Sequence, residues 1–291
     1  MPLEARGQSE SQPEASIENQ IVVEGKHYDS LETAREVRAI ATTQDGQLAR
    51  FHSPICPAVN GLPEDYATIV ESEIRNLAER GGLNVGDEGC KPNLTLIVAP
   101  SGTDLIDELK KQRPELLQAL SLLEFDRLRS SSGPAWSWQS TEPTRADGGP
   151  VEYISELQIE SKVTHLPKGS YQVRGANLGR LTQPTRQNLN LSFIVIERSA
   201  IEGMTLQQLG DFAAIAGLTA VKLNGTEKLG YASILSVFSD KRAGLEPETS
   251  ATEFDLAYLK AFYSGSPGKT AQQAIKFIAS SVEKDLSNSD D

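Results

Sequence analysis

The most apolar stretch of the 291-residue chain, residues 188–218, places the tightest constraint on its fold. Over 189–196 the apolar residues first alternate and then run together, which is typical of a strand whose later half is covered on both faces. From Thr205 onward the apolar spacing becomes helical, and Thr205 and Gln208 fit a capping box. The sequence therefore predicts a buried central strand over 189–196 that leads into a buried helix over 205–216.

The remaining apolar patterns predict an α+β fold, in which a twisted mixed sheet is covered by helices. Helices are expected at 30–40, 63–80, 101–111, 114–129 and 270–286, and strands at 21–23, 47–55, 94–99, 153–163 and 169–173. The strands at 153–163, 169–173 and 189–196 are expected to form a meander. The expected organisation is a disordered acidic leader at 1–20, one domain at 21–286 divided into 21–129, an open connection at 130–150 and 151–286, and an acidic tail at 287–291.

The formal net charge of -12 is concentrated at the two ends of the chain. Residues 1–20 and 283–291 each contain four acidic residues and one basic residue, so together they carry -6 of the -12. The lysines and arginines form no dense patch, which argues against a nucleic-acid partner and against an anionic membrane surface. No apolar run reaches the roughly 20 residues that a membrane helix requires.

The chain has two cysteines, Cys56 and Cys90, at opposite ends of the helix expected at 63–80. A strand, a helix and a returning strand would bring these flanks together, which favours a disulfide that closes a loop of about 35 residues and contributes ~3–4 kcal/mol. Disulfides persist in oxidising compartments, so we expect a periplasmic or secreted protein. Its signal peptide would have been removed, since the polar leader has no apolar signal core. The alternative is a cytoplasmic protein with two unpaired buried thiols.

Two tryptophans, Trp136 and Trp138, lie two residues apart within the connection 130–150. If this segment is extended, both rings face the same way, because side chains alternate along a strand. Two rings on one side of an edge strand can form a platform for a ligand. The alternative interpretation is that both rings pack on the sheet.

Three short motifs follow one another in the last third of the chain. A buried helix that ends in Gly217-Leu218 precedes a Ser233-Ile234-Leu235 turn, and a later helix ends in Phe262-Tyr263. This order resembles the zincin metalloproteases, particularly the metzincin layout, in which a His-Glu-x-x-His-x-x-Gly-Leu helix, a Ser-Ile-Met turn and a later helix ending in Leu-Tyr follow in that order. It is also similar to uncharacterised exported bacterial proteins with eroded zincin-like domains. The resemblance implies a zincin-like order of elements.

The residues that bind zinc in that family are missing here. Alignment on the Gly-Leu pair places Gly210, Ala214 and Ala220 where the three imidazole ligands belong. The general-base position is occupied by Asp211, and no histidine occurs after His165. Because zinc needs about three protein donors to be held and to activate a water molecule, the resemblance implies the scaffold without its metal chemistry. No metal and no cofactor are expected.

The preferred functional hypothesis is a non-catalytic binding module. A cleft between the sheet and the buried helix would hold an extended peptide or protein segment, which adds as a strand to an edge strand. The side chains expected to contribute to the floor of the cleft are Gln207, Asp211, Tyr231 and Ser233. The alternatives are a metal-independent hydrolase, in which Asp211 and Asp255 act as acid and base, and a purely structural or interaction protein.

Overall fold

The computed structural model describes residues 29–153, 171–172 and 183–289. Within these residues it contains eight α-helices and a four-stranded mixed sheet, which confirms the α+β fold. The helices are α1 (Ser30–Ile40), α2 (Glu64–Arg80), α3 (Gly102–Gln112), α4 (Leu122–Arg129), α6 (Leu206–Leu218), α7 (Val237–Ala243), α8 (Glu253–Ser264) and α9 (Ala271–Ser289). The short 3₁₀ segments are η1 (Pro114–Leu116), η2 (Arg198–Ile201), η3 (Leu223–Lys228) and η4 (Ile234–Ser236).

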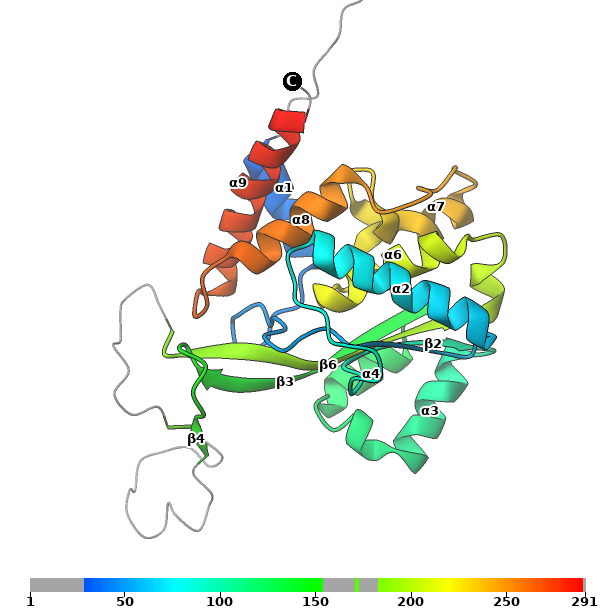
Figure 1. Cartoon of the computed structure of the whole chain (residues 1–291), viewed down its shortest axis with the longest axis horizontal. Helices are drawn as coiled ribbons and strands as arrows, with labels where there is room; N and C mark the ends of the chain where they lie inside the picture. Colours follow the sequence, from blue (N-terminus) through cyan, green and yellow to red (C-terminus); the bar gives the residue numbers. More distant parts are fainter. Residues whose placement is uncertain (1–28, 154–170, 173–182, 290–291) are drawn as a thin grey trace, which may run out of the picture.

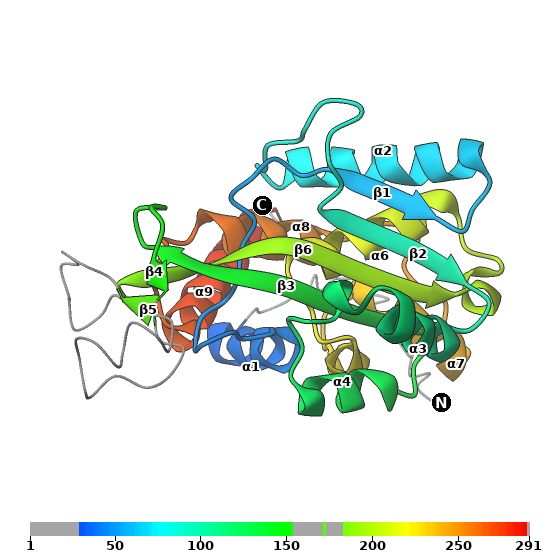
Figure 2. The same cartoon turned by 90° about the horizontal axis from the view of Figure 1, so that it is seen from below.

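The sheet has the strand order β1-β2-β6-β3 (Figures 1 and 2). Its strands are β1 (Pro57–Asn60), β2 (Leu94–Ala99), β6 (Thr185–Glu197) and β3 (Ala135–Arg145). Strands β1, β2 and β6 run parallel, whereas β3 runs antiparallel to β6, with a register shift between Ser140 and Thr141. The parallel part of the sheet therefore ends at β6, and β3 forms one edge.

Strand β6 and helix α6 lie at the centre of the fold, as the sequence predicts. The strand is longer than the expected 189–196, because its first residues pair with the far end of β3. Helix α6 begins with a complete capping box, in which Gln208 N–H donates to Thr205 Oγ1 (3.0 Å) and Thr205 N–H donates to Gln208 Oε1 (2.9 Å). Its close packing on the sheet requires Gly217, since a Cβ atom there would lie 2.8 Å from Ile194 Cδ1.

Helices cover the two faces of the sheet unequally (Figure 1). On one face, α1, α2, α6, α8 and α9 contribute to the larger apolar core, which includes the fully buried side chains of Phe212, Tyr258 and Phe262. On the other face, α3 and α4 cover a smaller cluster that contains Trp136 and Trp138. The sheet thus separates a thick apolar layer from a thin one.

The expected strand at 47–55 is wrong. Residues 48–51 are all buried, so this segment is enclosed on several sides and does not alternate between an inner and an outer face. It makes only isolated bridges, such as the one between Arg50 and Asn188 at the first half of β6. The segment therefore fills the space beside the sheet without becoming one of its strands.

Two expectations for the middle of the chain are also wrong. The segment 114–129 is not one helix, because Ser121 begins a new one with its own capping box, and α4 is separate from η1. The segment 130–150 is not an open connection throughout, since its residues 135–145 form β3. The alternating side chains of β3 pair along nearly the whole length of β6.

The expected meander with β6 is wrong for the residues that the structure describes. Tyr153 pairs with Tyr171 in a separate two-stranded sheet, formed by β4 (Glu152–Tyr153) and β5 (Tyr171–Gln172). The segments outside the described residues are 1–28, 154–170, 173–182 and 290–291, which include the expected leader, the expected strand at 21–23, His27 and His165.

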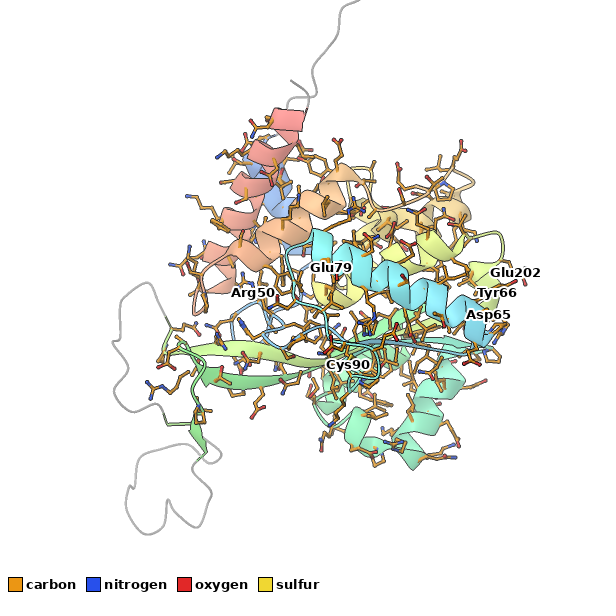
Figure 3. All side chains as sticks on the ribbon, in the orientation of Figure 1. Arg50, Asp65, Tyr66, Glu79, Cys90 and Glu202 are labelled. Carbon is orange, nitrogen blue, oxygen red and sulfur yellow. A yellow bond between two sulfur atoms is a disulfide. The ribbon has the colours of Figure 1, made fainter. Side chains whose placement is uncertain are left out.

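A disulfide joins Cys56, just before β1, to Cys90, in the connection between α2 and β2 (Figure 3). The Cα atoms are 6.0 Å apart and the two residues are separated by 34 positions, so the predicted bridge is confirmed. Next to it, Asn93 N–H donates to the carbonyl oxygen of Cys56 (2.9 Å), and Cys56 N–H donates to Asn93 Oδ1 (2.8 Å). The beginning of β1 is therefore tied to β2 both covalently and by hydrogen bonds.

Among the helices that the structure describes, none has the length and apolar character needed to cross a bilayer.

Candidate functional site

Two of the three positions that align with zinc ligands, Gly210 and Ala214, lie in the buried interior of α6, and the third, Ala220, is buried just after the helix ends. A Cβ atom at Gly210 would lie 2.6 Å from Glu73 Cβ and 3.3 Å from the carbonyl oxygen of Val70, so this part of α6 packs directly on α2. Ala214 is also fully buried. A histidine at position 210 would therefore require α2 to move. Within the described ranges, no group of three or more His, Cys, Asp or Glu residues is arranged to hold a metal ion.

Asp211 is buried, with 2% of its surface exposed. Its Oδ2 atom accepts a hydrogen bond from Ala251 N–H at 2.7 Å, which connects α6 to the segment before α8. Burial raises the pKa of Asp211, and the nearby Glu73 carboxylate raises it further. The side chain therefore connects two elements, and it does not project from an open floor.

Asp255 is completely buried at the beginning of α8. Its Oδ1 atom accepts from Ser233 Oγ (2.5 Å), and its Oδ2 atom accepts from the N–H groups of Ile234 (2.8 Å) and Thr252 (2.9 Å). Burial raises the pKa of Asp255, while these hydrogen bonds act in the opposite direction. The carboxylate thus fixes the turn at η4 against α8.

The structure brings only part of the predicted floor together. Ser233 contacts Asp255, and Asp211 reaches the neighbouring segment through Ala251. Gln207 is exposed in the first turn of α6, whereas Tyr231 is half-buried and lines a cavity that Asp211 does not line. These residues therefore do not form one open cleft.

The two tryptophans are packed on the sheet, which agrees with the second of the two interpretations. Trp136 and Trp138 are 3% and 2% exposed. The ring of Trp138 stacks on Phe193 with 5.1 Å between ring centroids, and its Nε1–H donates to the carbonyl oxygen of Leu116 (3.0 Å). Trp136 lies so close to Gly102 that a Cβ atom there would be 2.0 Å from the ring. The pair thus forms core of the thin layer.

Asp211→Asn is expected to leave stability at neutral pH unchanged or to raise it by about 1 kcal/mol, because the amide keeps an acceptor for Ala251 and removes a buried charge. Since the pKa of Asp211 is raised in the folded state, that state retains a proton after the unfolded chain has lost it. Wild-type stability should therefore fall as pH rises from the pKa of Asp211 in the unfolded chain to its raised pKa in the folded protein. Asp211→Asn should abolish this contribution to the pH dependence of stability. Denaturant unfolding at several pH values measures both effects. Asp211→Ala, which removes the acceptor, should cost about 1–3 kcal/mol, and equal losses in both variants would contradict the assignment.

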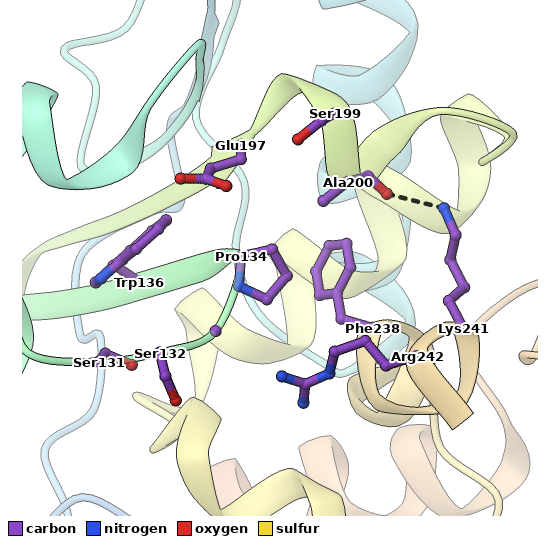
Figure 4. A pocket seen from close by; sticks show the side chains of 11 residues that line it. Ser131, Ser132, Pro134, Trp136, Glu197, Ser199, Ala200, Phe238, Lys241 and Arg242 are labelled. Atoms are coloured by element: carbon purple, nitrogen blue, oxygen red, sulfur yellow. Dashed lines mark hydrogen bonds between the residues drawn. The ribbon is translucent and has the colours of Figure 1, made fainter. Parts of the chain in front are cut away.

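Three adjoining cavities meet at the beginning of β3, and we name them together the β3 groove. Their volumes are about 540, 360 and 410 Å³. Ser131 lines all three, and Pro134, Phe238 and Arg242 line the first two. Figure 4 shows the first cavity, with Pro134 and Phe238 side by side at its centre. The lining residues of the whole groove fall within 127–139, 197–200, 212, 221–227 and 235–242, together with Thr42, Leu120 and Glu124.

The third cavity of the β3 groove lies beside the outer edge of β3, between that edge and the segment at Val221, whose carbonyl oxygen accepts from Ser137 Oγ (3.0 Å). Glu197 N–H donates to the carbonyl oxygen of Pro134 (2.9 Å). In the register of β3 and β6, the backbone groups of residues 134, 136 and 138 therefore face β6. Because hydrogen-bonded and outward-facing residues alternate in an antiparallel pair, Ser137 and Gln139 direct their backbone groups away from β6. Both residues line the third cavity. Over the described part of the chain, no strand pairs with this outer edge.

The floor of the β3 groove is apolar and its rim is charged. Phe212 and Phe238 meet edge to face, with ring centroids 4.8 Å apart. At the rim, Arg242 forms an ion pair with Glu227, and Lys241 Nζ donates to the carbonyl oxygen of Ala200 (2.9 Å). The residues that line the groove include no histidine and no cysteine. This composition is suited to holding an extended chain with apolar side chains.

Comparisons with protein-family models, with curated proteins and with solved structures find no match. The zincin-like order of elements therefore stays a prediction.

Sequence reasoning missed most of the groove. Phe238, Arg242 and Glu227 come from turns and a short helix about a hundred positions after β3, and nothing in their local sequence indicates a shared surface. One signal was available, since the alternation of residues 135–139 is typical of a strand. It supports the edge strand considered for Trp136 and Trp138, but it does not indicate which distant segments lie beside that edge.

Proposed function

We propose that this protein is a non-catalytic binding protein that captures an extended peptide segment as an additional strand on β3. The observation that supports this proposal is that the backbone N–H and C=O groups of Ser137 and Gln139 face away from β6, beside the β3 groove. Backbone hydrogen bonds would supply affinity, and alternate side chains of the peptide would enter the groove. The apolar floor at Phe212 and Phe238 favours a peptide with at least one large apolar side chain.

We further propose that the protein acts outside the cytoplasm, in the periplasm or as a secreted protein. The Cys56–Cys90 disulfide supports this location, because such bridges persist in oxidising compartments. A strand-adding protein there would meet unfolded or extended segments of other exported chains.

The hydrolase alternative has less support from the geometry. Asp211 and Asp255 each accept backbone N–H groups, and neither lines the β3 groove. A general acid or base has to reach the proton that it transfers, which buried carboxylates with these partners do not do. We therefore assign both carboxylates to the stability of the fold.

Gln139→Pro is the variant that tests strand addition. Proline removes the outward N–H of residue 139 without removing a hydrogen bond between β3 and β6, so the fold should persist while peptide binding weakens. A peptide selected against the wild type from a random linear library serves as the probe. We expect its Kd to rise about 10-fold, since one or two backbone hydrogen bonds and their register are lost.

Gln139→Ala is the matched control, because it shortens the same side chain but keeps the N–H group. The Nε2 atom of Gln139 has no hydrogen-bond partner, so this truncation removes none. Its Kd should stay within about 3-fold of the wild type. Equal binding by the alanine and proline variants, or failure of every library to yield a binder, would remove the case for strand addition. Circular dichroism and thermal unfolding of each variant confirm that the fold is intact.

A further inference from the structure

A separate cavity of about 570 Å³ lies between α1, the beginning of α8 and the end of α9. We name it the Tyr231 cavity. Its acidic and aromatic lining residues are Glu32, Glu36, Glu248, Glu253, Tyr231 and Phe254. Four of its lining residues are thus glutamates, and no lysine or arginine lines it. Its volume is in the range of sites that hold small organic molecules.

One of these carboxylates is only half satisfied. Glu36 Oε1 accepts from Gly230 N–H at 2.9 Å, whereas Glu36 Oε2 is buried and has no hydrogen-bond partner. Glu32 lies one helical turn away on α1, and like charges at this spacing repel each other. Burial raises the pKa of Glu36 and the charge of Glu32 raises it further, whereas the backbone N–H groups of Gly230 and Tyr231 act in the opposite direction. A positive charge placed in the cavity would remove this repulsion and give Oε2 a donor.

The aromatic wall of the cavity is held in place. Tyr231 stacks on Phe254, with 4.6 Å between ring centroids and 11° between ring planes. The hydroxyl of Tyr231 is 2.6 Å from Thr33 Oγ1, in a hydrogen bond that fixes the ring against α1. Aromatic faces attract ammonium and guanidinium groups and also pack against the methylene groups that carry them.

We propose that the Tyr231 cavity binds an organic cation with two or more ammonium or guanidinium groups joined by methylene chains. The carboxylates would pair with the charged groups, and Tyr231 would cover the methylene groups between them. The described residues around the cavity provide no cluster of ligands for a metal ion, which favours an organic cation over an inorganic one. Two sources supply this chemistry: a free polyamine, and the consecutive basic side chains of a peptide.

Calorimetric titration with spermidine and with the tripeptide Lys-Lys-Lys tests the proposal at low ionic strength, about 20 mM, where charge screening is weak. The double variant Glu32→Gln/Glu36→Gln should bind at least about 10-fold more weakly than the wild type, since two carboxylates are neutralised at the site. The glutamine at position 36 keeps an acceptor for Gly230, so the loop should stay in place. Glu79→Gln/Glu202→Gln is the matched control: it removes two charges from exposed side chains (Figure 3) and should change Kd less than about 2-fold.

A second pair of variants tests the aromatic wall. Tyr231→Phe keeps the ring and should bind spermidine nearly as well as the wild type, whereas Tyr231→Leu should bind about 5-fold more weakly. Binding of spermidine alone would identify a free amine as the source, and binding of both probes would identify a site that also accepts basic peptides. Absence of binding by both probes, equal weakening in the two double variants, or displacement of spermidine by an equal concentration of Mg²⁺ would overturn the proposal. Because this cavity shares no lining residue with the β3 groove, each proposal can fail independently of the other.

Discussion

Asp255→Ala should lower the free energy of unfolding by about 3–5 kcal/mol, because it leaves several buried donors without an acceptor. The donors are the hydroxyl of Ser233 and the N–H groups of Ile234 and Thr252. Urea unfolding followed by circular dichroism measures the loss. The turn at η4 should be the first element to lose its position, since the carboxylate is the group that joins it to α8.

Asp255→Asn separates hydrogen bonding from volume. The amide keeps one oxygen for the N–H groups of Ile234 and Thr252, and the hydroxyl of Ser233 can rotate to accept from the new NH₂ group. The buried charge is removed at the same time. We therefore expect a loss below about 1.5 kcal/mol. If asparagine and alanine destabilised the protein equally, the hydrogen bonds would not be the reason why this residue is needed.

Removal of the disulfide should be the second large effect. The double variant Cys56→Ser/Cys90→Ser is expected to lose about 3–4 kcal/mol, because the unfolded chain regains the freedom of the loop that the bridge closes. Cys56 is buried just before β1, and its backbone bonds to Asn93 hold the beginning of β2 in place beside it. The loss should therefore appear mainly as a less stable β1–β2 edge of the sheet.

A reducing agent provides the control for this variant. Wild-type protein in dithiothreitol should unfold at the same denaturant concentration as the double variant, whereas the double variant should not respond to the reductant. A wild type whose unfolding midpoint is unchanged by complete reduction would show that the bridge contributes no stability. Thiol titration after unfolding confirms the redox state in each sample.

The central pair of elements could be predicted because its signals are local. The apolar run of β6, and the reciprocal hydrogen bonds of Thr205 and Gln208, are set by residues close together in sequence. The pairing of Cys56 and Cys90 could also be predicted, since it follows from the reversal of chain direction around one helix. Each of these features depends on short-range spacing.

The candidate site could not be predicted in the same way, because it depends on contacts between distant segments. Gly210 was interpreted as a lost ligand position, but α2 packs against it, and only the crossing of the two helices reveals this. Ser233 was expected in a binding floor, although it is the partner of Asp255. In both cases the role of the residue is decided by a neighbour more than 20 positions away.

The unequal layers on the two faces of the sheet have a consequence for motion. Regions with few buried apolar contacts open at lower free energy than the rest of a protein, as cooperative units of their own. The layer formed by α3 and α4 rests on the smaller cluster, around Trp136 and Trp138, whereas α2 and α6 belong to the larger one. Partial unfolding should therefore begin with α3 and α4, which would loosen one wall of the β3 groove and leave the layer beneath α2 intact.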